Sequence, residues 1–120
     1  MKQFLATGID IVEVNRFKNF NKKSRLAFNT FTEKELSDCF SRANPSASLA
    51  ARFAAKEAVC KAFGNLDISL TVKDVEVVKD LNQSVKVIIK KNIVNLDNYK
   101  ISLSLTHEGS LAVAFCTILG

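Results

Sequence analysis

The sequence has few of the residues that staple small secreted proteins or bind structural zinc. It contains three cysteines in 120 residues, and no two of them have the C-x-x-C spacing. An odd number of cysteines without that spacing favours neither a disulfide framework nor a zinc site. We therefore interpret Cys39, Cys60 and Cys116, each of which has apolar neighbours, as free and buried thiols.

Long apolar runs are also missing. No stretch approaches the roughly 20 residues that span a bilayer. The N-terminal sequence MKQFLATGIDIVEV reaches Asp10 too early to contain the apolar core of a signal peptide. We therefore expect a cytoplasmic protein without a membrane segment. Repeats, low-complexity tracts and linkers are absent as well, so we interpret residues 1–120 as a single domain.

Aromatic residues other than phenylalanine are scarce. The sequence has no Trp, one Tyr and nine Phe within a hydrophobic fraction of 48%, so we expect a globular core built from Phe and aliphatic side chains. Charge is unbalanced, with 17 Lys and Arg against 12 Asp and Glu. The net charge of +5 suggests an acidic partner, and charge alone does not choose among nucleic acid, a phosphorylated cofactor and an acidic protein.

Helical patterns occupy the first half of the sequence. The T-x-x-E pattern of Thr32 and Glu35 indicates a capping box. Asn44 followed by Pro45, the only proline, marks another helix start, and Gly64 is the natural stop of the helix that begins there. The predicted helices occupy residues 12–25, 33–41 and 45–63.

Strand patterns dominate the second half, after a loop over residues 64–70. β-Branched and alternating residues on both sides of residues 80–83 predict a hairpin there. The predicted strands occupy residues 4–11, 72–79, 84–91, 100–106 and 110–118. Because the helices come before most of the strands, the pattern indicates an α+β fold.

Four ionisable side chains in apolar surroundings are the candidate site residues. Asp10 lies at a predicted junction between strand and helix, and His107, the only histidine, lies between the last two predicted strands. Glu57 and Lys61 are four residues apart in the alanine-rich stretch AARFAAKEAVCKAFG, so both lie on one face of a helix that is apolar or small elsewhere. Such charges are costly on a buried face unless they pair, bind a metal or serve a ligand.

The types of these residues favour phosphoryl chemistry on a diphosphate ester. Two carboxylates without neighbouring Cys or His ligands suit Mg²⁺, which typically takes one or two carboxylates and shares substrate phosphate oxygens. A nearby Lys suits phosphate, and a lone His can act as general base or hold a phosphate. Taken singly, each of these residues is more often structural: a turn residue, a surface ion pair or a solvated histidine.

Four segments resemble the holo-[acyl-carrier-protein] synthases, the small 4′-phosphopantetheinyl transferases, in that family's order and spacing. They are residues 8–17 (GIDIVEVNRF), 31–36 (FTEKEL), 51–64 (ARFAAKEAVCKAFG) and 102–107 (SLSLTH). The third segment is the most diagnostic, and together the four segments span the chain. Two positions depart from the family pattern. Asn65-Leu66-Asp67 stands where a second glycine is frequent, and Thr106 stands where a serine usually precedes the histidine.

The resemblance implies a phosphopantetheinyl transferase-like fold, with N-terminal helices packed on a largely antiparallel sheet. It implies transfer of the 4′-phosphopantetheine group from coenzyme A to a serine of apo acyl carrier protein, a step of fatty acid biosynthesis. It further implies that Asp10 and Glu57 hold Mg²⁺, that Glu57, Lys61 and His107 are catalytic, and that homotrimers form with active sites between subunits. The residues that it assigns to coenzyme A are Lys56, Lys61, Gly64 and His107.

Basic residues outnumber the single Glu13 in the predicted helix over residues 12–25. The resemblance gives this segment a specific role, since family members dock the acidic recognition helix of the carrier protein on it. The residues expected to dock the carrier protein are Arg16, Lys18, Lys22, Lys23 and Arg25.

Three other functions compete with this interpretation. A small basic nucleic-acid-binding domain would fit the net charge, but aromatic residues do not alternate with basic ones on the predicted strands. A Mg²⁺-dependent nuclease or phosphatase would use the same carboxylates. A purely structural oligomer would need none of them for chemistry. We expect neither a nucleic acid nor a membrane partner.

Overall fold

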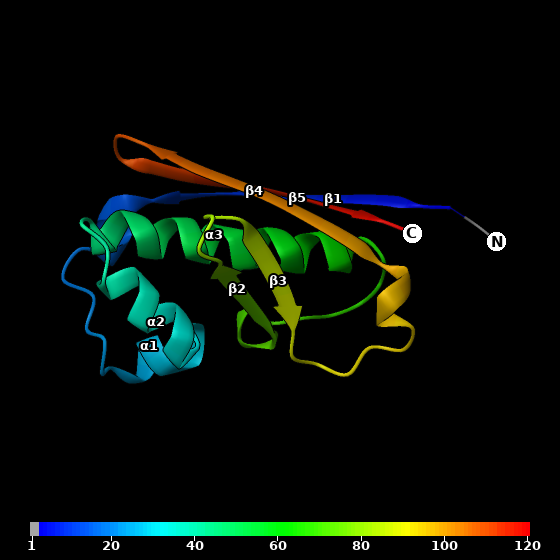
Figure 1. The fold of residues 1–120 in the computed structure, drawn as a ribbon, viewed down its shortest axis with the longest axis horizontal. Coiled ribbons are helices and arrows are strands. Elements are labelled where there is room, and N and C mark those ends of the chain that lie inside the picture. Colours follow the sequence, from blue (N-terminus) through cyan, green and yellow to red (C-terminus); the bar gives the residue numbers. More distant parts are fainter. Residues whose placement is uncertain (1–2) are drawn as a thin grey trace.

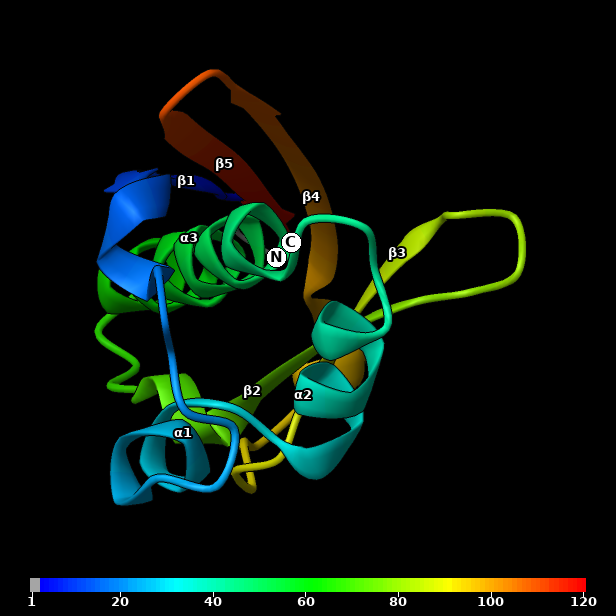
Figure 2. The same ribbon diagram turned by 90° about the vertical axis from the view of Figure 1, so that its left-hand side faces the viewer.

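The computed structural model describes residues 3–120 and places one long helix between a curved sheet and a layer of short elements (Figures 1 and 2). The helices are α1 (Arg25–Thr30), α2 (Glu33–Phe40) and α3 (Pro45–Gly64). The strands are β1 (Leu5–Glu13), β2 (Val75–Lys79), β3 (Val85–Ile89), β4 (Lys100–Glu108) and β5 (Leu111–Leu119). Helix α3 packs on the sheet of β1, β5 and β4, while α1, α2 and the β2–β3 hairpin lie on its other side.

Every strand pair within the described residues is antiparallel. Strand β5 is central in the three-stranded sheet, where Ala114 pairs with Asp10 of β1 and Ala112 pairs with His107 of β4. Strands β2 and β3 form the separate hairpin across residues 80–84. The predicted α+β class, with helices packed on an antiparallel sheet, is therefore confirmed.

Helix α3 is the centre of the core. Twelve of its 20 residues are buried, and they lie on all sides because the sheet covers one side while α2 and β2 cover another. Asn44 caps the helix, since its side-chain oxygen accepts a hydrogen bond of 3.2 Å from the Ala47 N–H. The buried helix predicted from Asn44-Pro45 is therefore confirmed. Among residues 3–120, neither α3 nor any other helix is long and apolar enough to cross a membrane.

Phenylalanine side chains form the core beside the N-terminal half of α3. The rings of Phe17, Phe20, Phe31 and Phe53 form pairs whose centroids are 5.2 to 6.5 Å apart, in tilted and edge-on arrangements. Such arrangements are those that aromatic rings prefer. The prediction of a core rich in Phe is confirmed for this part of the molecule.

The basic segment does not form the predicted helix over residues 12–25. Strand β1 continues to Glu13, a single 3-10 turn covers Val14–Phe17, and α1 begins only at Arg25. Asn19 adopts a left-handed backbone with φ of 60°, which is incompatible with a continuous right-handed helix. Ser24 then starts α1 as its N-cap by accepting a hydrogen bond of 3.0 Å from the Ala27 N–H.

Several further boundaries differ from the predicted ones, and three of them have a local cause. Gly64 is the last residue of α3 and not a left-handed residue beyond it, because the left-handed position falls at Asp67 with φ of 60°. Strand β2 starts at Val75, since Thr71 and Asp74 close a 3-10 turn ahead of it. Strand β4 continues through His107 to Glu108, because the chain reverses only at Gly109.

The side of the sheet that faces away from α3 carries exposed apolar side chains. The strand register places Ile9 opposite Phe115 and Leu5 opposite Leu119 on this side, whereas β4 contributes polar side chains such as Ser102. We call the exposed apolar residues of β1 and β5 the outer apolar patch: Leu5, Ile9, Ile11, Leu111, Phe115 and Leu119. An exposed apolar surface of this kind is typical of an interaction site.

Candidate active site

Asp10 lies on the side of β1 that faces α3. Successive side chains of a strand alternate between its two faces, and Ala6, Gly8 and Val12, which share the face of Asp10, are all buried. Its side chain is 16% exposed. Strand β1 comes very close to the helix here, since a β-carbon on Gly8 would lie 2.0 Å from the carbonyl oxygen of Ala58. Asp10 is therefore held beside α3 at the margin of the core.

Lys61 reaches Asp10 from helix α3. Its Nζ lies 3.0 Å from Asp10 Oδ1 and 3.0 Å from the backbone oxygen of Ile9, and it donates a hydrogen bond to each. The Lys61 side chain is 52% exposed, so its ammonium stands at the surface of the site. The structure thus brings together two predicted site residues that are 51 positions apart in the sequence.

Glu57 precedes Lys61 by one turn of α3 and is half-buried. No hydrogen bond or ion pair of its carboxylate occurs among residues 3–120, so its oxygens are available to a ligand. Asp10 and Glu57 are hard oxygen ligands, and Asp10 Oδ1 already accepts a hydrogen bond from the Lys61 ammonium. The donor set therefore fits Mg²⁺, which binds through one or two carboxylates and keeps water or phosphate oxygens at its other positions. No cluster of three or more His, Cys, Asp or Glu suited to a metal ion exists among the described residues.

Lys56 does not lie at this site. Its Nζ is buried and lies 2.5 Å from Glu35 Oε1, and the side chains of both residues are fully buried. Glu35 also accepts hydrogen bonds from the backbone N–H groups of Thr32, at 2.9 Å, and Val77, at 2.8 Å. Burial lowers the pKa of the Lys56 ammonium, and the Glu35 carboxylate opposes that shift. The structure therefore gives Lys56 an ion pair that joins α3 to α2 and β2, in place of the expected contact with coenzyme A.

A second ion pair between α3 and α2 lies near the first. The guanidinium of Arg52, which is 2% exposed, lies 2.5 Å from Asp38 Oδ2 through Nη2. It also donates a hydrogen bond of 2.9 Å from Nη1 to the Val77 oxygen. Burial by itself raises the pKa of the Asp38 carboxyl, but hydrogen bonds and charges from Arg52 and Arg42 outweigh it and lower the pKa below 3.8.

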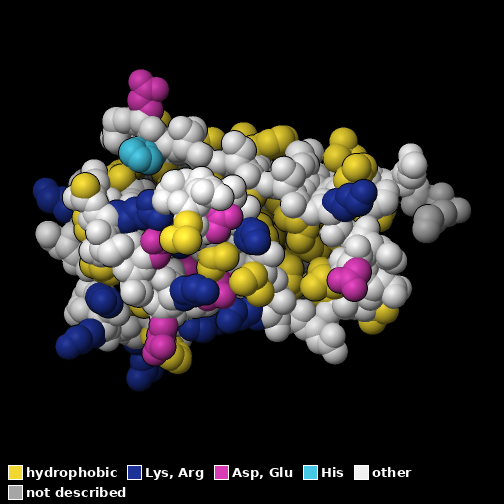
Figure 3. Space-filling view, in the orientation of Figure 1, with side chains coloured by type: hydrophobic (Ala, Val, Ile, Leu, Met, Phe, Trp, Pro, Cys, Tyr) yellow, Lys and Arg dark blue, Asp and Glu magenta, His cyan; other side chains and the backbone are white. Residues whose placement is uncertain are grey.

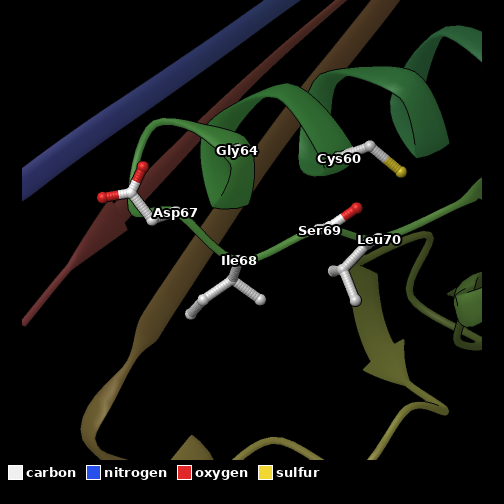
Figure 4. A pocket seen from close by; sticks show the side chains of 6 residues that line it. All are labelled: Cys60, Gly64, Asp67, Ile68, Ser69 and Leu70. Atoms are coloured by element: carbon white, nitrogen blue, oxygen red, sulfur yellow. The ribbon is translucent and has the colours of Figure 1, made fainter.

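Gly64 borders an open pocket of about 340 Å³ at the end of α3 (Figure 4). The pocket is lined by Cys60, Gly64, Asp67, Ile68, Ser69 and Leu70. A β-carbon on Gly64 would meet nothing within 4 Å, so space for a ligand exists beside this residue. Burial raises the pKa of the Cys60 thiol to about 12, so the thiol stays protonated and is a poor nucleophile.

The segment after Gly64, where the family's second glycine is missing, has a role in holding β1. Asn65 Nδ2 donates a hydrogen bond of 2.8 Å to the Thr7 oxygen. Lys61, one helical turn earlier, donates to the Ile9 oxygen. The side chains of Lys61, in α3, and of Asn65, the residue after α3, therefore satisfy backbone acceptors of β1.

His107 lies apart from Asp10 and Lys61 in the same chain. It is exposed near the end of β4, and β5 separates it from β1. Two strand spacings amount to about 10 Å. Within one chain the structure therefore brings Asp10 and Lys61 together, with Glu57 on the same helix face, and leaves His107 outside this group.

The expected docking residues lie on an exposed surface, although they do not form one helix. The basic side chains run through the 3-10 turn and the loop up to the start of α1, and Lys and Arg gather on that side of the molecule in Figure 3. The guanidinium of Arg16 lies 4.8 Å from the ring centroid of Phe53, and Lys22 Nζ lies 5.8 Å from that of Phe40. Such cation–π contacts orient the cations at the surface.

Two apolar residues beside this basic surface were not predicted from the sequence. Leu26 and Phe28 of α1 are 64% and 67% exposed, on both sides of the buried Ala27. Their only signal in the sequence is a pair of bulky apolar residues around an alanine directly after the basic run. The prediction of one helix over residues 12–25 included no separate helix at α1, so these two residues were not assigned to any element.

Comparison with known proteins identifies the family. A sequence profile of the 4′-phosphopantetheinyl transferase superfamily matches residues 6–116. The chain is 44% identical over 115 residues to a holo-[acyl-carrier-protein] synthase of Thermodesulfovibrio yellowstonii. This alignment covers 94% of the chain and 96% of that protein. The chain therefore belongs to the 4′-phosphopantetheinyl transferase superfamily and, within it, to the holo-[acyl-carrier-protein] synthases.

Solved structures agree with this assignment. The fold is similar to that of the acyl carrier protein synthase of Mycobacterium tuberculosis, with a TM-score of 0.73, 34% identity and coverage of 94% of this chain and 95% of that one. It is also similar to a holo-(acyl-carrier-protein) synthase of Bacillus anthracis in complex with CoA (3′,5′-ADP). There the TM-score is 0.72 and the identity 27%, over 98% of both chains.

Proposed function

We propose that the chain transfers the 4′-phosphopantetheine group of coenzyme A to a serine of apo acyl carrier protein, as a holo-[acyl-carrier-protein] synthase of fatty acid biosynthesis. The serine oxygen bonds to the phosphorus that carries pantetheine. The bond from that phosphorus to the bridging oxygen breaks, and adenosine 3′,5′-bisphosphate leaves. The observation that carries the proposal is the 3.0 Å contact of Lys61 with Asp10, beside Glu57, in a chain of this family.

Asp10 and Glu57 are the residues that would hold Mg²⁺. When bound, the ion neutralises charge on the diphosphate of coenzyme A. The two carboxylates come from β1 and α3, which touch at Gly8, so the backbone fixes the two elements that carry them. The Lys61 ammonium is half exposed and can turn from the Ile9 oxygen to a phosphate oxygen of the substrate. The nucleophile belongs to the carrier protein, which agrees with the protonated state of Cys60.

Coenzyme A would extend from Lys61 past Gly64 into the pocket at the end of α3. Its cationic and backbone contacts in this chain are Lys61 and Gly64, because Lys56 is committed to Glu35. His107 either contacts the nucleotide end or assists removal of the serine proton, and both roles suit an exposed imidazole.

We extend the proposal to a homotrimer with active sites between subunits. The outer apolar patch gives β1 and β5 a surface that another copy would cover. The separation of His107 from Asp10 within one chain supports a site completed by a neighbour's β4. Analytical ultracentrifugation tests this part, since a monomeric mass at the concentration of the activity assay contradicts it.

The carrier protein would dock on the exposed surface around η1 (Val14–Phe17) and α1. Its cations, Arg16, Lys18, Lys22, Lys23 and Arg25, attract an acidic helix. Leu26 and Phe28 add exposed apolar area beside these charges. An amphipathic helix with acidic and apolar side chains would find both kinds of partner here.

Mass spectrometry of the carrier protein tests the function directly. The chain is incubated with coenzyme A, Mg²⁺ and apo carrier protein, and the carrier is inspected for added phosphopantetheine. A phosphatase or nuclease with the same carboxylates would cleave coenzyme A without the carrier, whereas the proposed transferase consumes it only when apo carrier is present. Absence of the mass increase with Mg²⁺ and with Mn²⁺ would refute the proposal.

A further inference from the structure

The proposed metal ligand Asp10 is already paired with a cation from its own chain. Lys61 Nζ lies 3.0 Å from Asp10 Oδ1, and the Ile9 oxygen, also at 3.0 Å, gives the ammonium a second acceptor. Two acceptors on adjacent residues of β1 orient the end of this long, half-exposed side chain. The ammonium thus has a defined position next to the carboxylate.

An ammonium in this position opposes a metal ion at the same carboxylate. Asp10 Oδ1 accepts a hydrogen bond from Lys61, and the positive charge of Lys61 raises the energy of a second cation nearby. The site offers little to offset this cost, since no cluster of three or more potential metal ligands exists among the described residues. Metal and Lys61 therefore compete for Asp10 until another anion draws Lys61 away.

We infer that Lys61 occupies the position at Asp10 that the metal ion would take. As a result, the metal ion and coenzyme A each raise the affinity of the protein for the other. The inference rests on the proposed function, because it takes Asp10 and Glu57 as the metal ligands and Lys61 as a phosphate contact. Phosphate oxygens of coenzyme A draw Lys61 from Asp10 and free Oδ1 for the metal. Because linkage is reciprocal, the metal raises the affinity for coenzyme A by the same factor.

The test is a Mn²⁺ titration of the coenzyme-free protein, with free Mn²⁺ measured by electron paramagnetic resonance. Lys61→Met removes the charge and keeps the length of the side chain, and Lys61→Arg keeps the charge. Lys86→Met removes an exposed charge on β3, away from Asp10, and controls for the change in net charge. Thermal unfolding of each variant checks that the fold is retained, as expected for substitutions at exposed lysines.

We expect Lys61→Met to bind Mn²⁺ about tenfold more tightly than the wild type, which corresponds to about 1.4 kcal/mol. Two like unit charges about 4 Å apart repel by about 1 kcal/mol in water and by more at a protein surface, and the exposure of Lys61 places the effect at the low end. Lys61→Arg and Lys86→Met should stay within about twofold of the wild type. Saturating coenzyme A should raise Mn²⁺ affinity by a larger factor in the wild type than in Lys61→Met.

The outcomes separate this inference from the proposed function. Wild-type affinity or weaker binding in Lys61→Met, or an equal effect of coenzyme A in both proteins, overturns the inference and leaves the metal site intact. If the wild type and Lys61→Met bind Mn²⁺ no better than Asp10→Asn, the metal site itself is refuted, and the inference falls with the proposed role of Asp10.

Discussion

A β-carbon on Gly8 would stand 2.0 Å from the carbonyl oxygen of Ala58, so β1 and α3 touch backbone to backbone at this point. Hydrogen bonds from Lys61 to the Ile9 oxygen and from Asn65 to the Thr7 oxygen hold the strand on both sides of the contact. Asp10 lies two residues beyond Gly8. The position of this carboxylate beside Lys61 therefore depends on a residue that has no side chain.

Replacement of Gly8 by Ala should destabilise the protein by about 3 kcal/mol, near the upper end for overpacked sites, because the clashing atoms belong to backbone. Urea unfolding followed by circular dichroism measures the change in the free energy of unfolding. Gly64→Ala is the matched control, since Gly64 ends α3 with open space beside it. It should be neutral or stabilise by up to about 1 kcal/mol. Equal stability of the two variants would contradict the close contact at Gly8.

Loss of the Lys56 ammonium should be costly because Glu35 would remain buried without its cation. We expect Lys56→Met to lower the free energy of unfolding by about 3–5 kcal/mol. The double variant with Glu35→Gln should lose less than the sum of the two single variants, since each single change leaves the other partner buried and alone. Additive losses would show that Lys56 and Glu35 do not stabilise each other.

Asp38 should make part of the stability dependent on acid pH. Because the pKa of Asp38 is lowered in the folded state, its contribution to stability is present above about pH 3.8 and is lost as pH falls through the folded-state pKa. As the pH falls from 5 to 2.5, the free energy of unfolding measured in urea should therefore decrease more steeply for the wild type than for Asp38→Asn. Identical slopes would mean that the pairs with Arg52 and Arg42 do not bias ionisation.

Charge reversal at the docking surface should affect the carrier protein and spare the coenzyme. For the double variant Arg16→Glu and Lys23→Glu, we expect the KM for the carrier to rise at least about tenfold, because acidic residues of the partner would meet like charge. The KM for coenzyme A should not change. Lys86→Glu on β3 makes the same kind of charge change away from this surface and serves as the control. Unchanged kinetics for the carrier would remove the docking proposal.

The sequence predicted correctly the helix starts that are determined by residues within one turn of each other. Asn44 and Pro45 start α3, and Thr32 and Glu35 form the expected capping box, because caps are built within one turn. The prediction of a helix over residues 12–25 was wrong. The cations and apolar residues of this segment have helical spacing, but Asn19 adopts a left-handed conformation that the spacing does not reveal.

Long-range contacts account for the rest. The sequence could suggest that Asp10, Glu57 and Lys61 belong to one site, but not that Lys61 binds Asp10 directly. Lys56 looked as available as Lys61, since the two residues share one helix, and the partner that buries Lys56, Glu35, lies 21 residues away. Gly8 and Ala58 are 50 positions apart, so the need for glycine at that place appears only when strand and helix meet.

The central claim is that the Asp10, Glu57 and Lys61 site carries out the transfer, and Glu57→Gln tests it most directly. The substitution keeps size and removes one of the two proposed metal-binding carboxylates, while Glu33→Gln changes an exposed glutamate of α2 as the control. The measurement is the rate at which phosphopantetheine is added to apo carrier protein, followed by mass spectrometry with coenzyme A and Mg²⁺. We predict that the rate for Glu57→Gln is at least about 100-fold lower than that of the wild type. Thermal stability should be retained, and Glu33→Gln should react at the wild-type rate. Transfer by Glu57→Gln at the wild-type rate would contradict the account.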